Sequence, residues 1–307
     1  MLRPSPQDGT RKPIASAARA PRALSPKLIV GSCETELSGI PPSSVQTTVT
    51  SPPYFRQKDY QAKGQLGWEP TVGDYVARLG KIFKELLRVT SDSGCCFFVV
   101  GDTYLNKALQ LVPQRLAIAA AESGWTVRND LIWSKTDAAP DGSTDRWRFV
   151  HEHILFLTKR ARGYKFHPDQ IRVPYSPVTL RRWSSGQQYG GNKAKEEAGP
   201  LGQRFKKGKT FKLNANGTLP RDVIECATAR SPLDHFATFP LELVERFVLA
   251  TTDEGDLVGD PFAGMATTGI AAIRNGRRFI GIELNSVYAQ AGKKRLMNEP
   301  IMSEHAA

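Results

Sequence analysis

Short apolar segments of strand length alternate with segments of helical character along most of this 307-residue chain. The strand candidates are residues 28–30, 46–50, 95–100, 125–133, 151–157, 257–259 and 278–282. Helices are expected from residue 71, from Pro113, from Pro240, over 270–274 and after Asn285. Strands that alternate with helices at this spacing predict an α/β fold with a doubly wound, mostly parallel sheet. Such sheets bind ligands beyond the carboxyl ends of their strands, so motifs at strand ends are the first site candidates.

A rigid polar turn directly follows the strand candidate at 46–50, and its residues are Ser51, Pro52, Pro53 and Tyr54. Two consecutive prolines fix two φ angles and remove two backbone donors, so this turn cannot continue the sheet. The Ser51 hydroxyl, the free carbonyls beside it and the flat ring of Tyr54 suit one task well. Together they can hold the exocyclic amino group of a stacked heterocycle. An ordinary turn that ends a strand is the alternative, because motifs this short also occur by chance.

A second motif, rich in small residues, lies between the strand candidate at 257–259 and the next helix. Gly264 permits a positive φ angle or a close approach of the backbone to a ligand. Thr267 and Thr268 can cap the helix and present hydroxyls. Glu283 ends the next strand, where an acid can accept hydrogen bonds from ribose hydroxyls. Because both motifs sit at strand ends, we expect them to share one crevice although about 200 residues separate them.

The glycine motif also nearly reads as the G-x-G-x-x-G fingerprint of dinucleotide sites. An NAD(P)-dependent oxidoreductase is therefore an alternative, and a plain glycine turn between strand and helix is another. The three residues Asp260, Pro261 and Phe262 before the glycine do not belong to that fingerprint. A dehydrogenase also has no use for a Pro-Pro-Tyr turn.

Nearly all of the net charge of +12 lies in one stretch that makes up less than one fifth of the chain. Residues 159–212 contain 14 Lys/Arg and 3 Asp/Glu, interleaved with aromatic residues. Concentrated cations with stacking groups predict a phosphate-binding surface, and a disordered basic insert is the alternative. The region shows no sustained periodicity, so we expect residues 159–230 to form an irregular region outside the sheet.

The remaining composition argues against several classes of protein. No apolar run approaches membrane-spanning length. Residues 1–26 are rich in Pro, Ala, Ser and Arg, lack the apolar core of a secretory signal, and are expected to form a disordered basic arm. The four cysteines, at positions 33, 95, 96 and 226, have no metal-ligand spacing. We therefore expect a reduced cytosolic protein with no disulfides and no metal site.

Together these motifs resemble those of the bacterial amino-methyltransferases that use S-adenosylmethionine on DNA. Residues 51–54 match the family's (Asp/Asn/Ser)-Pro-Pro-(Tyr/Phe) catalytic motif, residues 260–264 its cofactor motif, and Glu283 its ribose-binding acid. Further segments resemble the element before the cofactor strand (235–240) and the middle of the family's domain (124–125, 129–135 and 151–153). The order of the motifs is similar to the family's β arrangement. The resemblance runs from about residue 28 to 294 and leaves only the basic block unmatched.

This resemblance implies a Rossmann-like methyltransferase fold with S-adenosyl-L-methionine as cofactor. A serine at position 51 is typical of members that methylate N4 of cytosine. The expected target is therefore N4 of a cytosine flipped out of duplex DNA, with N6 of adenine as the alternative. An NAD-type oxidoreductase and a non-enzymatic DNA-binding protein are remoter alternatives. Methylation of cytosine C5 is discounted, because it needs a cysteine nucleophile after a proline and the chain has none.

The resemblance also assigns roles to individual residues. The catalytic set is Ser51, Pro52, Pro53 and Tyr54. The cofactor-binding set is Ser32, His235, Phe239, Asp260, Pro261, Phe262, Gly264, Thr267, Thr268, Glu283 and Asn285. The DNA-binding set is expected from charge and aromatic content rather than from the resemblance, and it is Arg56, Lys58, Arg181, Arg182, Trp183, Arg204, Lys206 and Lys207. The chain departs from the family pattern at Ala266, where glycine is usual, and at Ser32, where aspartate often follows the glycine.

The implied organisation has five parts. They are a disordered arm (1–26), the catalytic half of the methyltransferase domain (27–158), an inserted target-recognition region (159–230), the cofactor-binding half (231–298) and a tail (299–307). Double-stranded DNA is the expected partner, and a cognate restriction endonuclease is a further candidate. A monomer or homodimer in the bacterial cytoplasm, associated with the nucleoid, is expected.

Overall fold

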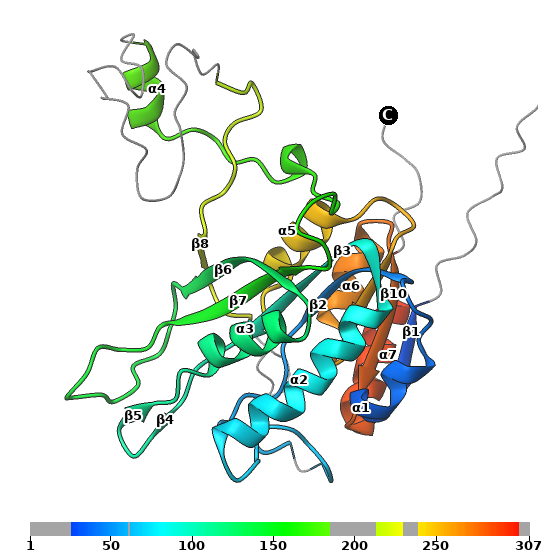
Figure 1. Ribbon diagram of the computed structural model, residues 1–307. Coiled ribbons are helices and arrows are strands. Elements are labelled where there is room, and N and C mark those ends of the chain that lie inside the picture. Colours follow the sequence, from blue (N-terminus) through cyan, green and yellow to red (C-terminus); the bar gives the residue numbers. More distant parts are fainter. Residues whose placement is uncertain (1–25, 61, 185–212, 230–238, 301–307) are drawn as a thin grey trace, which may run out of the picture.

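The computed structural model describes residues 26–60, 62–184, 213–229 and 239–300, and one large sheet runs through this part of the chain (Figure 1). Its order is β1-β10-β9-β2-β3-β7-β6-β8. The strands are β1 (Lys27–Val30), β2 (Val45–Thr50), β3 (Thr90–Val100), β6 (Thr126–Lys135), β7 (His151–Thr158), β8 (Val223–Cys226), β9 (Leu257–Asp260) and β10 (Arg278–Glu283). All neighbours pair in parallel except β7, which is antiparallel to both β3 and β6. The prediction of a mostly parallel α/β sheet is confirmed.

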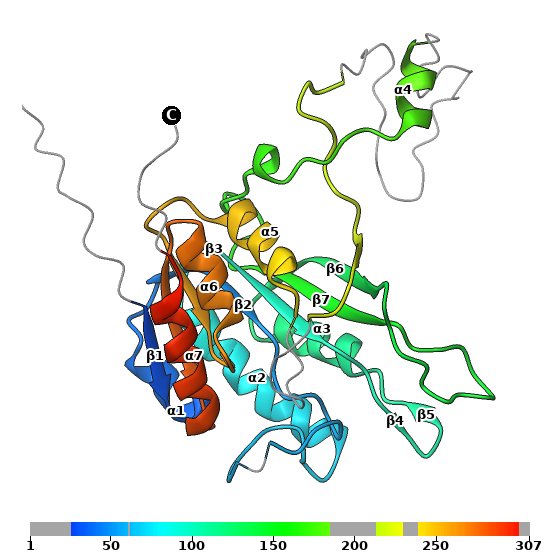
Figure 2. The ribbon, with the colours of Figure 1, turned by 180° about the vertical axis from the view of Figure 1, so that it is seen from behind.

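Helices cover both faces of this sheet, as Figures 1 and 2 show from opposite sides. One face carries α1 (Cys33–Glu36), α2 (Val72–Val89) and α3 (Val112–Glu122), and the other carries α5 (Leu241–Thr251), α6 (Thr267–Arg274) and α7 (Ser286–Asn298). Strand β3 contributes to both cores. Phe97 and Val99 pack into one core, and Phe98 and Val100 pack into the other. A continuous apolar run is what a strand buried on both faces requires.

Two of the expected helix starts are confirmed in detail. Thr71 and Asp74 form a reciprocal capping box at α2, with Asp74 N to Thr71 Oγ1 at 3.1 Å and Thr71 N to Asp74 Oδ2 at 3.2 Å. Asn285 caps α7, because its Oδ1 accepts a hydrogen bond from Val287 N at 2.9 Å. These side chains satisfy backbone donors that the first turn of a helix leaves open.

The start of α6 differs from the expectation. Neither Thr267 nor Thr268 caps this helix, because the residue in the cap position is Ala266, in the left-handed region at φ 61°. Thr268 is fully buried and donates its hydroxyl proton to the carbonyl oxygen of Val49 at 3.1 Å. The entire first turn of α6 is buried, so the Thr268 hydroxyl serves the contact with β2 rather than the helix end.

The expectation that residues 159–230 lie outside the sheet is wrong at the C-terminal end of that range, and the N-terminal end is fixed to the sheet by side-chain and backbone contacts without joining it. Val223–Cys226 forms β8, which pairs with β6 at the sheet edge. Lys165 donates its backbone N–H to Ser93 O at 2.8 Å and pairs its Nζ with Asp253 and Asp256 at 2.6 and 2.5 Å. A four-residue strand with only Ile224 buried carries too little periodicity to be recognised in the sequence.

Between these anchored ends, the basic region leaves the sheet on a narrow stem (Figure 1). Val173 and Thr218 exchange both backbone hydrogen bonds at 2.9 Å, and the helix α4 (Pro177–Ser184) lies beyond them. Gly217 has φ 98°, and a Cβ there would meet the Val173 carbonyl oxygen at 2.2 Å, so only glycine fits. None of the α4 residues is buried.

Two further features concern only the described residues. None of their helices combines the length and the apolar character that crossing a membrane would need. Their His, Cys, Asp and Glu side chains form no group of three or more that could hold a metal ion.

Candidate active site

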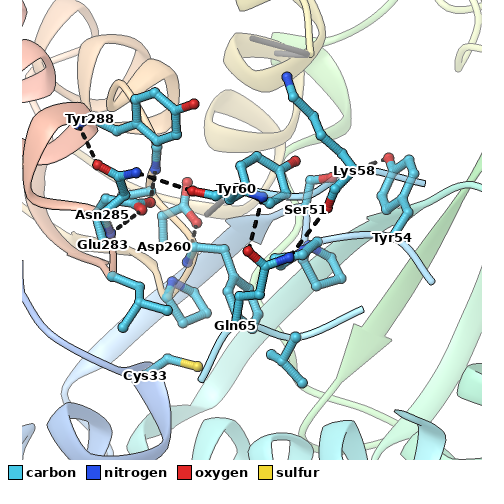
Figure 3. Close-up of a pocket in the computed structure, with 18 of the residues that line it drawn as sticks. Cys33, Ser51, Tyr54, Lys58, Tyr60, Gln65, Asp260, Glu283, Asn285 and Tyr288 are labelled. Atoms are coloured by element: carbon cyan, nitrogen blue, oxygen red, sulfur yellow. Dashed lines mark hydrogen bonds between the residues drawn. The ribbon is translucent and has the colours of Figure 1, made fainter. Parts of the chain in front are cut away.

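The two sequence motifs line a single cavity of about 530 Å³ (Figure 3). Ser51 to Tyr54 enter it from the end of β2, Asp260 to Gly264 from the end of β9, and Glu283 from the end of β10. Because β2 and β9 are neighbours in the sheet, their carboxyl ends open into the same space. The expectation that the motifs share one crevice is confirmed.

Asp260 joins the two motifs directly. Its Oδ1 accepts a hydrogen bond from Thr50 Oγ1 at 2.7 Å and another from Phe262 N at 3.1 Å. Only 3% of Asp260 is exposed, and this burial raises the pKa of its carboxyl group to about 7. The carboxyl group therefore fixes the end of β2 relative to the turn after β9.

Glu283 holds the small-residue turn in place from the other side. Its Oε2 accepts a hydrogen bond from Gly264 N at 2.7 Å, and its Oε1 accepts one from Asn285 N at 2.8 Å. Burial raises the pKa of Glu283, while the two backbone donors oppose that shift. A carboxylate has about four acceptor positions, so lone pairs remain for hydroxyl donors from a ligand.

Most of the expected cofactor residues reach the cavity wall, but not all of them do. Those that line it are Ser32, Phe239, Asp260, Pro261, Phe262, Gly264, Thr267, Glu283 and Asn285. Ser32 also caps α1 by accepting a hydrogen bond from Glu34 N at 3.3 Å. Thr268 does not line the cavity, because its buried hydroxyl is bonded to Val49 O. His235 lies outside the described residues.

A chain of hydrogen bonds runs through the Pro-Pro turn. Ser51 Oγ donates to Tyr54 Oη at 3.1 Å, and Tyr54 Oη donates to Glu152 Oε2 at 2.6 Å. Lys135 Nζ donates to the other Glu152 oxygen, Oε1, at 2.5 Å. Burial, reinforced by the Glu152 charge, raises the pKa of Tyr54 well above its usual value, so its hydroxyl stays protonated.

Glu152 and Lys135 both line the cavity and were not among the site residues expected from sequence. They are brought together by the antiparallel pairing of β6 and β7, which sets Trp133 opposite Glu152. Their segments carry the family resemblance at residues 129–135 and 151–153. That resemblance, rather than any local pattern of charge, was the available signal.

The backbone of the Pro-Pro turn is also held from outside the cavity. The buried Tyr75 of α2 donates its hydroxyl proton to the Pro53 carbonyl oxygen at 2.9 Å. Gly101 follows β3 directly beside the Tyr54 ring, and a Cβ there would lie 2.9 Å from ring atom Cε2. The ring of Tyr54 therefore has a fixed position as well as a fixed hydroxyl.

The loop after Tyr54 closes one side of the cavity. Gln57, Lys58, Tyr60 and Gln65 line it, and burial lowers the pKa of Lys58. The Tyr60 carbonyl oxygen accepts a hydrogen bond from Asn285 Nδ2 at 3.4 Å, which ties this loop to the start of α7. The loop also has an apolar anchor, because Phe55 and Leu66 are buried in the core.

The expected DNA-binding residues occupy different places. Lys58 lines the cavity, whereas Arg56 is exposed and lies over the Trp68 ring at 5.4 Å. Arg181, Arg182 and Trp183 lie on α4, and none of them lines the cavity. Arg204, Lys206 and Lys207 lie outside the described residues.

Comparisons with known proteins agree with this architecture. The N6/N4 family model described as DNA methylase matches residues 45–294. A curated relative, the type II methyltransferase M.Cfr9I of Citrobacter freundii, is 30% identical, with 89% of this chain and 88% of the relative covered.

Two solved structures extend the comparison. A putative DNA modification methylase from Thermus thermophilus, crystallised with S-adenosyl-L-methionine, is 26% identical with a TM-score of 0.61. That match covers 91% of this chain and 96% of the Thermus protein. The cytosine-N4-specific PvuII DNA methyltransferase shares the fold with a TM-score of 0.61 at 19% identity, over 88% of this chain and 89% of the PvuII enzyme.

Proposed function

The chain belongs to the N6/N4 DNA methylase family, and from that premise we propose that it transfers a methyl group from S-adenosyl-L-methionine to N4 of cytosine in duplex DNA. One observation carries the proposal. The Ser51 turn and the Glu283-held glycine turn open into the same cavity, so an amino group and a methyl donor can meet there. Membership in this family argues against the NAD-type oxidoreductase considered from the sequence.

The cavity fits S-adenosyl-L-methionine in size and in chemistry. Its volume of about 530 Å³ lies within the range of small-molecule sites, roughly 300–1,000 Å³. Glu283 offers acceptors for ribose hydroxyls, and the rings of Tyr60, Phe262 and Tyr288 line the cavity and offer aromatic surface for adenine. The relative crystallised with this compound supports the same assignment. When bound, S-adenosyl-L-methionine supplies an electrophilic methyl group.

Ser51 is prepared to accept a hydrogen bond from the target amino group. Its single proton points to Tyr54 Oη, and Tyr54 in turn donates to the Glu152 carboxylate. The lone pairs of the Ser51 oxygen are therefore left for the amino protons, and the charge at Glu152 strengthens the whole chain. An amino nitrogen that donates to Ser51 and to the Pro52 carbonyl shifts toward tetrahedral geometry and aims its lone pair at the methyl donor.

The flipped base then stacks on the ring of Tyr54, whose position is fixed by Gly101 beside it and by Glu152 at its hydroxyl. Enzymes that modify a base in a duplex rotate it into a pocket of this kind and stack it on aromatic side chains. Attack by the amino nitrogen is direct and needs no covalent enzyme intermediate. Positioning and removal from water supply the acceleration.

Cytosine is favoured over adenine because position 51 is a serine, which is typical of members that methylate N4 of cytosine. The type II methyltransferase relative supports a role in restriction–modification, with a cognate endonuclease as the partner that such a role implies. The basic region around α4 is the proposed target-recognition part, because Arg181 and Arg182 are exposed cations on a helix that stands away from the sheet.

The decisive experiment uses the full chain, labelled S-adenosyl-L-methionine and mixed-sequence duplex DNA, followed by nucleoside analysis. N4-methylcytosine is expected from the wild type, and Ser51→Ala is expected to lose the product while still binding the cofactor. N6-methyladenine would overturn the cytosine assignment and leave the methyltransferase assignment intact. Cofactor binding without any methylated nucleoside would contradict duplex DNA as the substrate.

A further inference from the structure

Two extensions of the sheet lie side by side (Figures 1 and 2). One is the hairpin of β4 (Tyr104–Leu105) and β5 (Ala108–Leu109), which follows β3, and the other is the connection between β6 and β7, residues 136–150. Lys107 Nζ lies 2.8 Å from Asp145 Oδ2, and the Arg146 guanidinium lies 4.1 Å from the centre of the Tyr104 ring. These contacts join the two extensions into one projecting unit.

Trp147 stands out from this unit into solvent. It is 94% exposed, more than any other large hydrophobic residue that the structure describes. The side chains on either side of it are bonded within the connection. Arg146 Nη1 pairs with Asp141 Oδ2 at 3.0 Å, and Arg148 Nη2 donates to the Ala138 carbonyl oxygen at 2.8 Å. A bulky aromatic ring is therefore presented to solvent on a braced loop rather than packed into the core.

The position of Trp147 relates it to the cavity. The connection that bears it starts after Lys135 and ends before Glu152, and both of these residues line the cavity. Trp147 comes four positions before His151 at the start of β7, a span of at most about 14 Å. This span exceeds the groove depths of B-DNA, which are about 7.5–8.5 Å, so the connection is long enough for its ring to reach the base stack of a duplex bound over the cavity.

We propose that Trp147 enters the duplex at the target base pair and stacks on the bases beside the vacated position. This inference rests on the proposed function. A flipped base leaves a gap in the stack, and apolar or aromatic side chains are the groups that proteins insert between base steps. By filling the gap, Trp147 keeps the target base in the cavity and slows its return to the helix.

The charges around Trp147 indicate whether this unit would contact DNA through phosphates or through stacking. Arg146 and Lys107 are already paired with Asp141 and Asp145, so the unit adds little net positive charge. Its contribution to DNA binding comes from stacking rather than from phosphate contacts. Replacement of Trp147 should therefore leave the salt dependence of binding unchanged, unlike the loss of a phosphate-binding lysine or arginine.

The test compares wild type, Trp147→Phe and Trp147→Ala on two unmethylated duplexes that contain the target site of the enzyme. One duplex is fully paired, and the other has an abasic position opposite the target base, which is then already unpaired. On the paired duplex, Trp147→Ala should lower the single-turnover rate about 10- to 100-fold, with Trp147→Phe in between. On the abasic duplex the loss should shrink to less than about threefold, because little unstacking is left to support.

Met297→Ala is the matched control, since Met297 is 81% exposed on α7 and does not line the cavity. Equal rates for wild type and Trp147→Ala on the paired duplex would overturn the inference, and so would an equal loss on both duplexes. A self-association of the wild type that Trp147→Ala abolishes would overturn it as well and assign the ring to a second copy of the chain.

Fluorescence gives a readout that does not depend on turnover. Stacking between bases should quench Trp147 when the fully paired duplex binds, and this part of the signal change should be missing in Trp147→Phe. Duplex binding with the same signal change in both proteins would overturn the inference. Methylation by the wild type tests the proposed function separately. Failure of the proposed function can therefore be distinguished from failure of the inference about Trp147.

Discussion

At the residue scale, the hydroxyl of Tyr54 has a role separate from its ring. The hydroxyl passes a hydrogen bond from Ser51 to Glu152, whereas the ring offers a stacking face. Tyr54→Phe removes the first function and keeps the second. We expect kcat to fall at least about tenfold, because a hydrogen bond to a charged group contributes about 1.5–3 kcal/mol. Binding of S-adenosyl-L-methionine and of duplex DNA should stay at wild-type levels.

Tyr54→Ala is the companion variant. It should lose a further ~1–3 kcal/mol, the usual contribution of one base stacked on an aromatic side chain. Single-turnover rates of both variants, measured at saturating cofactor and DNA, separate the two functions. A Phe variant as fast as the wild type would show that the Ser51–Tyr54–Glu152 chain has no part in catalysis.

The buried carboxyl group of Asp260 should make the stability of the protein depend on pH. Its pKa is raised from 3.8 to about 7 by burial, so the folded protein keeps a proton that the unfolded chain releases above about pH 4. This contribution to stability is complete below pH 4 and is lost as the pH rises through 7. Asp260→Asn keeps an acceptor oxygen for Thr50 and Phe262 N but does not titrate.

The stability of the wild type relative to Asp260→Asn should therefore fall between pH 4 and pH 8. The total change is up to about 4 kcal/mol, at about 1.36 kcal/mol for each pKa unit. Urea unfolding of both proteins across this range measures it. A difference that does not vary with pH would mean that the Asp260 pKa is the same in the folded and unfolded chains.

The place of a site residue was predictable from the sequence where one short segment contains the whole motif. Ser51 and Glu283 each lie at a strand end in a recognisable motif, and both line the cavity as expected. Glu152 and Lys135 were missed because their meeting depends on the register of two antiparallel strands, which no local pattern encodes. Thr268 lies behind the cavity wall although its neighbour Thr267 lines the cavity, because the side chain of Thr268 faces β2.

At the scale of single elements, α6 begins with an unfavourable backbone. Ala266 adopts φ 61°, a left-handed conformation that costs a residue with a Cβ roughly 1–2 kcal/mol and costs glycine little. Ala266→Gly should therefore raise the free energy of unfolding by about 1 kcal/mol, despite the greater entropy of glycine in the unfolded chain. Ala271→Gly, in the buried middle of the same helix, should lower it by at least about 1 kcal/mol. Thermal melts of the three proteins provide the measurement, and destabilisation by both variants would contradict the argument.

Elements with internal signals were predictable, and those defined by a partner were not. The helices α2 and α7 carry their own caps and start where the sequence places them, and β3 contains the predicted apolar run but begins five residues earlier, at Thr90. Strand β8 exists because the edge of β6 offers a row of backbone donors and acceptors. The β4–β5 hairpin is held partly by the ion pair and ring contact with residues of the neighbouring connection.

At the scale of the whole molecule, charge on the basic region should govern the affinity for DNA rather than the chemistry. The double variant Arg181→Ala, Arg182→Ala removes two exposed cations from α4. It should weaken duplex binding and reduce the slope of log affinity against log salt by up to about 1.8, at about 0.9 for each phosphate contact. Binding of S-adenosyl-L-methionine should be unchanged.

Lys293→Ala, Lys294→Ala is the matched control, because these two exposed cations lie on α7, away from α4 in both views of the fold, and carry the same charge. Fluorescence anisotropy at several salt concentrations compares the two double variants. An equal reduction in slope would show that net charge alone, and not the place of α4, determines binding.

The strand order also constrains how the protein is made. β1, near the start of the chain, pairs only with β10 among the described strands, and β2 has β9 as one of its two neighbours. During translation the first strands leave the ribosome about 200 residues or more before the partners that complete their side of the sheet. Until then the nascent chain exposes unpaired strand edges, which are prone to association and to engagement by chaperones. A chain whose synthesis stops early would lack the Glu283 side of the cavity and the β9–β10 part of its sheet, so methylation can begin only after the last strand has been made.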